Sequence, residues 1–364
     1  MTSLPLLGVQ LQRHLFPLLE DELGPLSALD GEFSALLVLA DLGRFARPYA
    51  WCGNGARPHA RVWLMRAFLA KSVYQFPTTA ALRAALASRP ALRRLCGWDR
   101  AGDLPSEPTF SRAFAAFAAH ALPQQIHARM VTAHAGSKLV GHLSRDATAI
   151  AVPERPGPKP VPVKPPARPR GRPKTGAPRL PPPPKRLDLQ VTRAVTENLA
   201  ELPCLCAIGV KRSSQGFQSF WVGYKLHLDT GDGDLPVSAV LTSASVHDNQ
   251  AAIPLAQLSA QRVTSLYDLM DSAYDAPQIR AFSRQLGHVP IIAANRRGSG
   301  LVRELEPAHA VRFRERSAAE RVNSRLKERY GGRWVRVRGG AKVMCHLMFG
   351  LIALTAAALF ARIV

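Results

Sequence analysis

Hydrophobic residues in the first part of the chain recur every three or four positions, which is the spacing of amphipathic helices. Leu, Phe and Ala show this spacing most clearly in residues 32–46, 61–75 and 109–122. Runs of β-branched residues, which favour strands, are few in the same stretches. We therefore expect an all-helical domain over residues 1–137, with basic residues on its outer surface.

After residue 138 the pattern changes to alternation. Residues 139–151 alternate with period two, which predicts a strand with Asp146 near its middle. Residues 219–229 and 235–243 flank a Gly-Asp-Gly-Asp turn and predict an antiparallel hairpin. Further strands are expected at 264–270 and 289–294, and helices at 249–260, 276–286, 315–329 and 342–362. Residues 138–364 therefore predict a mixed sheet covered by helices, an α/β or α+β domain.

Residues 153–186 interrupt this domain, because they hold nearly half of the chain's 30 prolines together with many basic residues. Proline fixes φ and removes a backbone donor, so we expect a flexible, extended, cationic insert. The whole chain has a formal net charge of +22, which favours a polyanionic partner, most simply nucleic acid. Its hydrophobic share of 47% excludes general disorder. A merely soluble basic protein is the plainer alternative.

Several features bear on the compartment. The five cysteines are odd in number and scattered, which predicts no disulfide framework and fits a reducing cytoplasm. Cys204 and Cys206 have no second pair or His cluster nearby, so a structural zinc site is not expected. The N-terminal residues lack the pattern of a secretory signal. Residues 343–360 are apolar and nearly long enough to span a membrane, but a buried core helix has the same composition, and we expect the latter.

Three carboxylates lie in elements that one fold would bring together. Asp146 lies in the first strand, Asp271 ends a later strand and Glu320 lies on a charged helix. An RNase H-like sheet has its first and fourth strands at the centre and its last helix across them, which would gather these acids. Phosphodiester cleavage needs such a group, because two Mg²⁺ ions held by carboxylates activate the nucleophile and stabilise the leaving oxygen.

Other side chains compete for these roles. Asp268 and Asp275 lie close to Asp271 in the sequence. Asp268 suits the other face of the sheet, and Asp275 suits the start of a helix as a cap. Asp248 is more readily explained as a helix cap, and His247 as a structural residue. These alternatives stay open at this point.

The geometry of the charged helix supports two interpretations. At about 100° per residue, Arg316, Glu320 and Lys327 share one face, and Phe313 joins them if the helix extends that far back. Glu315 leaves this face. A solvated helix with an i,i+4 ion pair between Arg316 and Glu320 would explain two of these residues. A metal ligand flanked by two phosphate-binding cations would explain all of them.

A resemblance favours the second interpretation. Arg316, three residues, Glu320, six residues and Lys327 resemble the signature helix of DDE-class transposases of bacterial insertion sequences. Their pattern begins with Tyr, where this chain has Phe313, so the ring is kept and the hydroxyl is missing.

Other segments support the same resemblance. Asp271 begins a Asp-Ser-Ala-Tyr segment that resembles the family's second aspartate motif, and Asp146 within DATAI resembles its first-strand aspartate. Residues 92–114 are similar to the helical N-terminal region of these proteins, and the apolar C-terminal segment is similar to the C-terminal end of these proteins. The resemblance thus covers nearly the whole chain apart from the insert.

The resemblance implies an RNase H-like catalytic domain after an all-helical, DNA-binding domain. The enzyme would bind the terminal inverted repeats of its element, cut the ends and join the freed 3′-hydroxyl to target DNA, as a homodimer on double-stranded DNA. Asp146, Asp271 and Glu320 would hold two Mg²⁺ ions, with Mn²⁺ as a substitute. Arg316 and Lys327 would grip phosphates near the cleaved end. The expected location is the cytoplasm, at the nucleoid when DNA is bound, with no membrane association.

Two basic segments are further DNA-binding candidates. Pro-Arg-Gly-Arg-Pro-Lys at residues 169–174 has the form of an AT-hook, in which Arg170 and Arg172 would enter a narrow A·T minor groove. A solvated basic linker is the plainer interpretation. Arg296 and Arg297 are expected to contact phosphate. Two other functions fit the same residues: a catalytically inactive DNA-binding protein that uses the AT-hook-like segment, and a nuclease that never joins ends.

Overall fold

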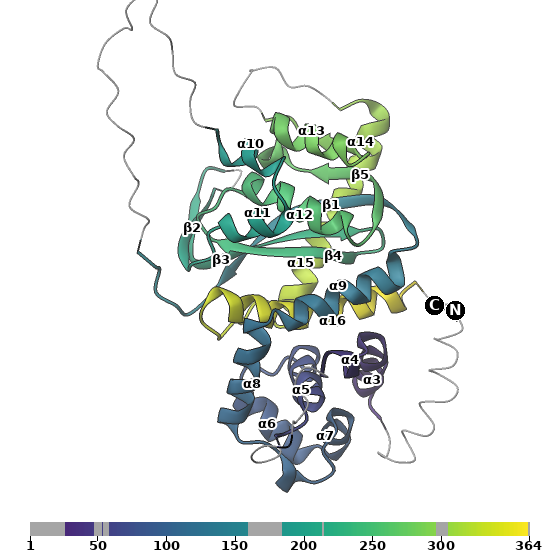
Figure 1. The fold of residues 1–364 in the computed structure, drawn as a ribbon, viewed down its shortest axis with the longest axis vertical. Helices are drawn as coiled ribbons and strands as arrows, with labels where there is room; N and C mark the ends of the chain where they lie inside the picture. The colour runs from purple at the N-terminus through teal and green to yellow at the C-terminus, as the bar shows by residue number, and fades with distance from the viewer. Residues whose placement is uncertain are drawn as a thin grey trace, which may run out of the picture.

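The computed structural model describes residues 26–46, 53, 58–158, 184–212, 215–295 and 305–362. Figure 1 shows a group of short helices below and a sheet with its covering helices above. Two long helices, α9 (Leu122–Ala135) and α16 (Gly340–Phe360), lie side by side between them. The two parts of the molecule therefore meet along this central pair.

The region before the sheet is helical, as the three- and four-residue spacing predicts. Its elements are α3 (Ala28–Ala40), α4 (Gly43–Ala46), α5 (Arg61–Val73), α6 (Thr79–Ser88), α7 (Pro90–Cys96), the 3₁₀ turn η3 (Ala101–Asp103), α8 (Glu107–Ala119) and α9. Ser27 and Asp30 start α3 as a capping box, in which each side chain accepts a hydrogen bond from the other's backbone N–H. Gly97 ends α7 at φ 113°, a left-handed conformation that favours glycine.

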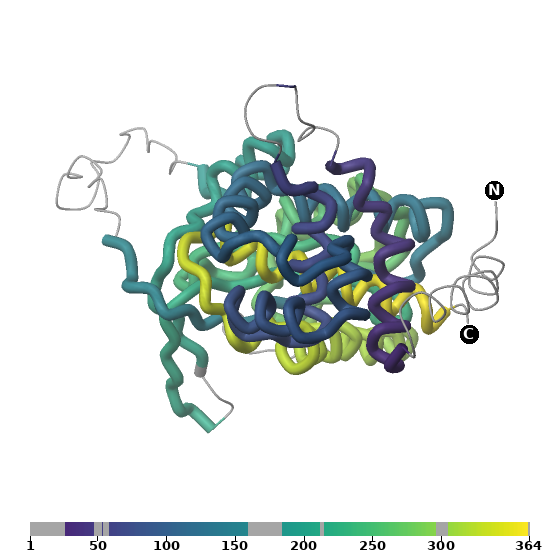
Figure 2. The backbone as a smooth tube through the Cα atoms, turned by 90° about the horizontal axis from the view of Figure 1, so that it is seen from below, coloured from purple at the N-terminus to yellow at the C-terminus, as the bar shows by residue number. Residues whose placement is uncertain are grey.

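Six strands form one mixed sheet in the described part of the chain. They are β1 (Leu139–Ala151), β2 (Ala207–Arg212), β3 (Gln218–Gly231), β4 (Leu235–Ser243), β5 (Thr264–Met270) and β6 (Val289–Ile292). The ranges of β1, β4 and β5 are those that alternation predicts. Strand β3 is longer than expected, and β2 is not predicted at all. Figure 2 shows the hairpin of β2 and β3 projecting from the body of the molecule.

The pairing of these strands confirms the expected fold class. β1 runs antiparallel to β3 and parallel to β5, and β5 runs parallel to β6. β3 also pairs antiparallel with β2 through its first half and with β4 through its second half. β1 and β5 are therefore neighbours in the middle of the sheet, as the RNase H-like arrangement requires.

Helices cover both faces of this sheet. They are α10 (Arg186–Gln190), α11 (Val195–Glu201), η4 (Asp248–Ala251), α12 (Ala252–Ala260), η5 (Ser272–Tyr274), α13 (Pro277–Gln285), α14 (Pro307–Phe313), η6 (Arg314–Arg316), α15 (Ser317–Arg329) and α16. α15 packs against β1 and β3, and α12 packs against β3 and β4. The continuous helix expected at residues 315–329 is wrong at its start, because the 3₁₀ turn η6 precedes α15.

The hydrophobic core runs through both parts of the molecule. α16 packs against α3, α5, α8 and α9 of the helical region and also against β4 and α15. Among the described helices, α16 alone is long and apolar enough to cross a membrane, and 89% of its most apolar 18-residue window is buried inside the protein. The division into residues 1–137 and 138–364 stays a prediction, since the core does not separate them.

Candidate active site

Asp146 and Asp271 stand at the same level of the sheet on neighbouring strands. In the parallel ladder of β1 and β5, Arg145 pairs with Met270, so the next position on each strand is one of these aspartates. Asp271 turns the chain at the end of β5, and its Oδ1 accepts a hydrogen bond of 2.9 Å from the N–H of Ala273. Two segments far apart in the sequence thus bring their carboxylates together.

Burial dominates the electrostatics of both carboxylates. It raises the pKa of Asp146 to about 6, with the charge of Asp271 adding to the effect and the charge of Arg316 opposing it. Burial also raises the pKa of Asp271, with Asp248 adding to the effect and Arg316 again opposing it. The two carboxylates are therefore partly desolvated, and a nearby cation would favour their charged forms.

Asn323 on α15 binds Asp146 directly. Its Nδ2 donates to Oδ2 of Asp146 at 3.0 Å, and its own Oδ1 has no hydrogen-bond partner among the described residues. The sequence predictions missed this residue, because they searched for carboxylates and cations. Its place one turn after Glu320 on the same helix face is the signal that could have found it.

Glu320 does not join the two aspartates. Its side chain is 57% exposed and forms an i,i+4 ion pair with Arg316. Within the described residues, no three His, Cys, Asp or Glu side chains lie close enough together to hold a metal ion. The charge of Arg316 acts on both Asp146 and Asp271. Arg316 therefore links Glu320 to the aspartate pair.

The remaining residues of the charged helix are divided by the break before α15. Phe313 ends α14, while Arg316 belongs to η6, so the assumption of one continuous helix over Phe313, Arg316 and Lys327 is wrong. The guanidinium of Arg316 still lies 5.9 Å from the centre of the Phe313 ring. Lys327 is half-buried on α15; burial lowers its pKa, and the negative charge of Asp146 opposes that shift. The charge of Asp146 thus acts on Lys327, as the charge of Arg316 acts on Asp146.

Four arginines that are expected to bind DNA lie outside the described residues. They are Arg170, Arg172, Arg296 and Arg297. Most of the proline-rich insert also lies outside them, and the chain is described again from residue 184. Their contacts with DNA stay predictions.

The two acids nearest to Asp271 in the sequence have other partners. Asp268 is 1% exposed and accepts hydrogen bonds from His288 and Ser283, so it faces away from the site as expected. Asp275 forms an ion pair of 2.9 Å with Arg280. It does not cap the following helix, which contradicts the capping role expected for it.

The turn after β4 contributes a third carboxylate. His247, rather than Asp248, occupies the cap of η4, and Asp248 forms an ion pair of 2.8 Å with Lys225. The charges of Asp248 and His247 both act on the pKa of Asp271. Tyr274 lies fully buried beside these groups, and its hydroxyl has no partner in the described part of the chain. Asp248 and Tyr274 therefore lie near Asp271, although the sequence predictions assigned neither to the site.

Comparisons with known proteins agree with this geometry. A family model described as a transposase DDE domain matches residues 205–356, and one described as a transposase domain (DUF772) matches residues 21–116. The chain belongs to the DDE-class transposases of insertion sequences. Searches of curated proteins and of solved structures each return no significant match.

The DDE match covers only part of the site of this transposase. It contains Asp271, Arg316, Glu320 and Lys327, but it begins after Asp146. The proline-rich insert separates β1 from the matched segment. The assignment of Asp146 therefore depends on the ladder that β1 forms with β5 and on the contact with Asn323.

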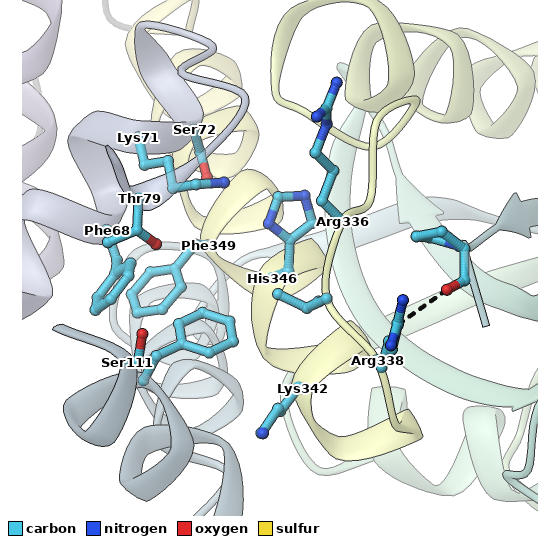
Figure 3. Close-up of a pocket in the computed structure, with 13 residues that line it drawn as sticks. Phe68, Lys71, Ser72, Thr79, Ser111, Arg336, Arg338, Lys342, His346 and Phe349 are labelled. Atoms are coloured by element: carbon cyan, nitrogen blue, oxygen red, sulfur yellow. Dashed lines mark hydrogen bonds between the residues drawn. The ribbon is translucent and has the colours of Figure 1, made fainter. Parts of the chain in front are cut away.

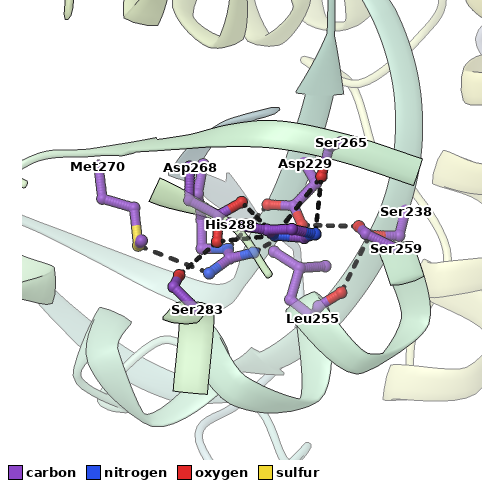
Figure 4. Close-up of polar contacts among 10 residues, drawn as sticks. Asp229, Ser238, Leu255, Ser259, Ser265, Asp268, Met270, Ser283 and His288 are labelled. Carbon is purple, nitrogen blue, oxygen red and sulfur yellow. Dashed lines mark hydrogen bonds and ion pairs between the residues drawn. The ribbon is translucent and has the colours of Figure 1, made fainter. Parts of the chain in front are cut away.

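Behind Asp146, the transposase buries a paired polar network on the opposite face of the sheet (Figure 4). Arg145 donates two hydrogen bonds of 2.8 Å to the carboxylate of Asp229, which also accepts one of 2.6 Å from Ser259. Arg145 is 2% exposed and Asp229 is fully buried. Because β1, β3 and α12 are tied together here, the network fixes the strand from which Asp146 projects.

Proposed function

We propose that this transposase binds the terminal inverted repeats of its insertion sequence, hydrolyses phosphodiester bonds at the ends and joins the 3′-hydroxyl to target DNA. The observation that carries the proposal is the pair of partly desolvated carboxylates, Asp146 and Asp271, at one level of two central strands. The charge of Arg316 acts on both carboxylates, and Lys327 is coupled to Asp146. A phosphate bound beside the aspartates would meet both cations.

The oxygen atoms of this site fit a hard divalent cation. Transposases of this family generally use divalent metals, and Asp146, Asp271 and Glu320 would hold two Mg²⁺ ions here, with Mn²⁺ as a substitute. The raised pKa values of both aspartates support this assignment, because carboxylates held in a partly dry site gain from a bound cation. When bound, the ions would activate the nucleophile and stabilise the leaving oxygen.

The other side chains would position the DNA and the ligands. Glu320 would exchange its ion pair with Arg316 for the metal, which would release the guanidinium to bind a phosphate in a bidentate manner. Lys327 would act as a point charge on a neighbouring phosphate. Asn323 would orient Asp146, and the ring of Phe313 would support Arg316.

Double-stranded DNA is the proposed partner, both as element ends and as target. The net charge of +22 supports it. Arg170 and Arg172 of the insert would contact the minor groove, and Arg296 and Arg297 would contact phosphates. We place the enzyme in the cytoplasm, at the nucleoid when DNA is bound, and expect a homodimer that holds two ends.

One observation favours a second candidate function. Glu320 is exposed and ion-paired with Arg316 instead of grouped with the aspartates. A protein in which this arrangement is permanent would bind DNA without cutting it. The alternative is therefore a catalytically inactive DNA-binding protein.

A cleavage assay separates the two functions. The substrate is a duplex with the terminal repeat that flanks the gene, incubated with Mg²⁺ or Mn²⁺. We expect cleavage by the wild type, none by Asp146→Asn or Asp271→Asn, and a loss of about 10- to 100-fold with Asn323→Ala, which orients a ligand. Wild-type protein that binds this duplex but leaves it intact would support the second function. Cleavage by Asp271→Asn at the wild-type rate would contradict the proposed site.

A further inference from the structure

A cavity of about 370 Å³ lies between the helical region and the segment that leads into α16 (Figure 3). Lys71 of α5, Thr79 of α6 and Ser111 of α8 line it from the helical side. Residues between 336 and 349 line it from the other side. Its walls therefore come from segments that are far apart in the sequence and that belong to both parts of the molecule.

Positive charge gathers around this cavity. Its 13 lining residues include Lys71, Arg336, Arg338 and Lys342, and none of the 13 is an aspartate or glutamate. The last three cations are exposed. Arg338 uses its Nε to donate a hydrogen bond of 3.0 Å to the carbonyl of Pro153, which fixes its position at the rim. A concave surface with four cations and no acid attracts anions.

Lys71 differs from the rim cations because it is half-buried without a counter-ion. Figure 3 shows it extending from α5 toward His346, and its ammonium has no hydrogen bond or ion pair within the described residues. Burial and the charge of Arg336 lower its pKa to about 8. His346 offers no compensation, since burial lowers its pKa to about 4 and its Nε2 donates to the carbonyl of Gly331. A desolvated ammonium beside another cation is unfavourable unless an anion is bound.

A second cavity lies beside the first, on the side of α15. It has a volume of about 190 Å³ and shares Lys71 and His346 with the first. It is also lined by the cations Lys327 and Arg333, by one acid, Glu328, and by the exposed Trp334. The negative charge of Asp146 acts on the ammonium of Lys327. A path with more cations than acids therefore runs from Lys327, through the second cavity, to the cavity between the two parts of the molecule.

We propose that this path binds the DNA backbone next to the cleaved bond, with Lys71 and the rim cations Arg336, Arg338 and Lys342 as the phosphate-binding residues. The inference rests on the proposed function in one respect, namely that DNA enters the carboxylate site. Phe68 packs against Phe349 with ring centres 5.8 Å apart, and both rings are buried, so they give the cavity a rigid floor. DNA bound there would join the helical region to the catalytic site.

The test uses Lys71→Met in the full-length protein. Removal of a buried, uncompensated ammonium should raise the melting temperature of the free protein. The same change should weaken binding of a fluorescein-labelled terminal-repeat duplex about tenfold, measured by anisotropy, because a charge-assisted hydrogen bond is lost. The slope of log K against log salt should fall in magnitude by about 1. Lys342→Gln at the rim should weaken binding and reduce the slope without the gain in melting temperature.

Lys138→Met is the matched control, because it removes the same charge from an exposed lysine outside both cavities. We expect it to bind the duplex nearly as well as the wild type. Equal affinities and salt slopes for wild type, Lys71→Met and Lys342→Gln would overturn the inference. The inference would also be overturned if inorganic phosphate raised the melting temperature of the wild type but not of Lys71→Met, while both proteins bound the duplex equally well. The cavity would then hold a small anion instead of DNA.

The assay distinguishes a failure of this inference from a failure of the proposed function. Wild-type protein that cuts the duplex, with all cavity variants binding as the wild type does, would contradict the cavity alone. Wild-type protein that does not cut the duplex, with binding lost in Lys71→Met, would contradict the cleavage and support the cavity.

Discussion

Arg145 and Asp146 are neighbours on β1, but their side chains enter opposite faces of the sheet and opposite electrostatic environments. Arg145 is fully buried, and the carboxylate of Asp229 matches its guanidinium with two hydrogen bonds of 2.8 Å. Asp146 is partly desolvated, and its side-chain partner is a single amide, that of Asn323. One face of the strand is thus internally compensated, while the other carries charge that the described residues leave incompletely matched.

The acids on the two faces respond in opposite directions. Burial alone would raise the pKa of Asp268, but hydrogen bonds from His288 and Ser283 and the charge of Arg145 lower it below its usual value. Burial raises the pKa of Asp146, and its partners do not reverse the shift. The difference teaches that burial acts to raise the pKa of both acids and that their partners decide the sign of the net shift. The unmatched face is the one available to a cation and a phosphate.

Breaking the compensated face should have the largest effect on stability. Arg145→Met leaves the carboxylate of Asp229 buried without its cation, which should lower the free energy of unfolding by about 3–5 kcal/mol. Urea denaturation followed by circular dichroism measures this loss. The double variant Arg145→Met with Asp229→Leu should recover much of it, because both charges are then removed.

Arg321→Met provides the control for that prediction. Arg321 pairs with Asp234 at 2.8 Å, but its side chain is 51% exposed. Its loss should cost no more than about 1 kcal/mol. If Arg145→Met were as mild as Arg321→Met, the network would not hold β1, and the proposed contrast between the two faces would be lost.

Much of the fold could be predicted from the sequence because its signals are local. Alternation and the glycine-rich turn are sufficient for β1 and β4, and they place Asp146 on a strand. Strand β2 was missed because it lies along a projecting hairpin with exposed apolar residues: Ile208 is 50% exposed and Val210 is 52% exposed. Because such a strand does not bury one face in the core, its sequence does not have to alternate between apolar and polar residues, and alternation cannot predict it.

The site was only partly predictable, for a different reason. The proximity of Asp146 and Asp271 could be predicted, because the RNase H-like fold places β1 beside β5 and both strands were predicted from the sequence. The break at η6 is not visible in a helical wheel, since a wheel assumes a continuous helix. Asn323 was missed because an amide carries no charge to mark it, and the role of Arg145 was missed because it depends on Asp229, far away in the sequence.

Removing the charge of Asp146 should stabilise the fold, whereas Arg145→Met should destabilise it, and the change in the free energy of unfolding should be smaller. Asp146→Asn removes a partly buried carboxylate, which should raise the free energy of unfolding by about 1–2 kcal/mol at pH 8. The folded state binds a proton at Asp146 more readily than the unfolded state does, so the wild type loses stability as pH rises from about 4 to about 6. The advantage of Asp146→Asn should therefore grow across this window and vanish below it.

Asp268→Asn is the matched control for this second prediction, since it changes an acid of the compensated face. The pKa of Asp268 is lowered in the folded protein, so its charged form stabilises the fold above pH 4 and this contribution is lost as pH falls. Asp268→Asn should thus be destabilised at pH 8, where Asp146→Asn is stabilised. Melting temperatures measured from pH 4 to pH 8 test both predictions. If the two variants shifted the melting temperature in the same direction at pH 8, the proposed contrast between the two faces would be wrong.

The smallest effect on stability is expected from Glu320→Gln. This variant separates the catalytic activity of the site from the stability of the fold. Glu320 is exposed and paired with Arg316, four residues earlier, so the loss of its charge should change the free energy of unfolding by no more than about 0.5 kcal/mol. Cleavage of the terminal-repeat duplex should nevertheless fall to background, because the proposed third ligand is gone. Glu315→Gln, an exposed acid five residues earlier, should leave both quantities unchanged. Equal cleavage by Glu320→Gln and Glu315→Gln would mean that the ion pair with Arg316 is the whole role of Glu320, and the site would then consist of the aspartates alone.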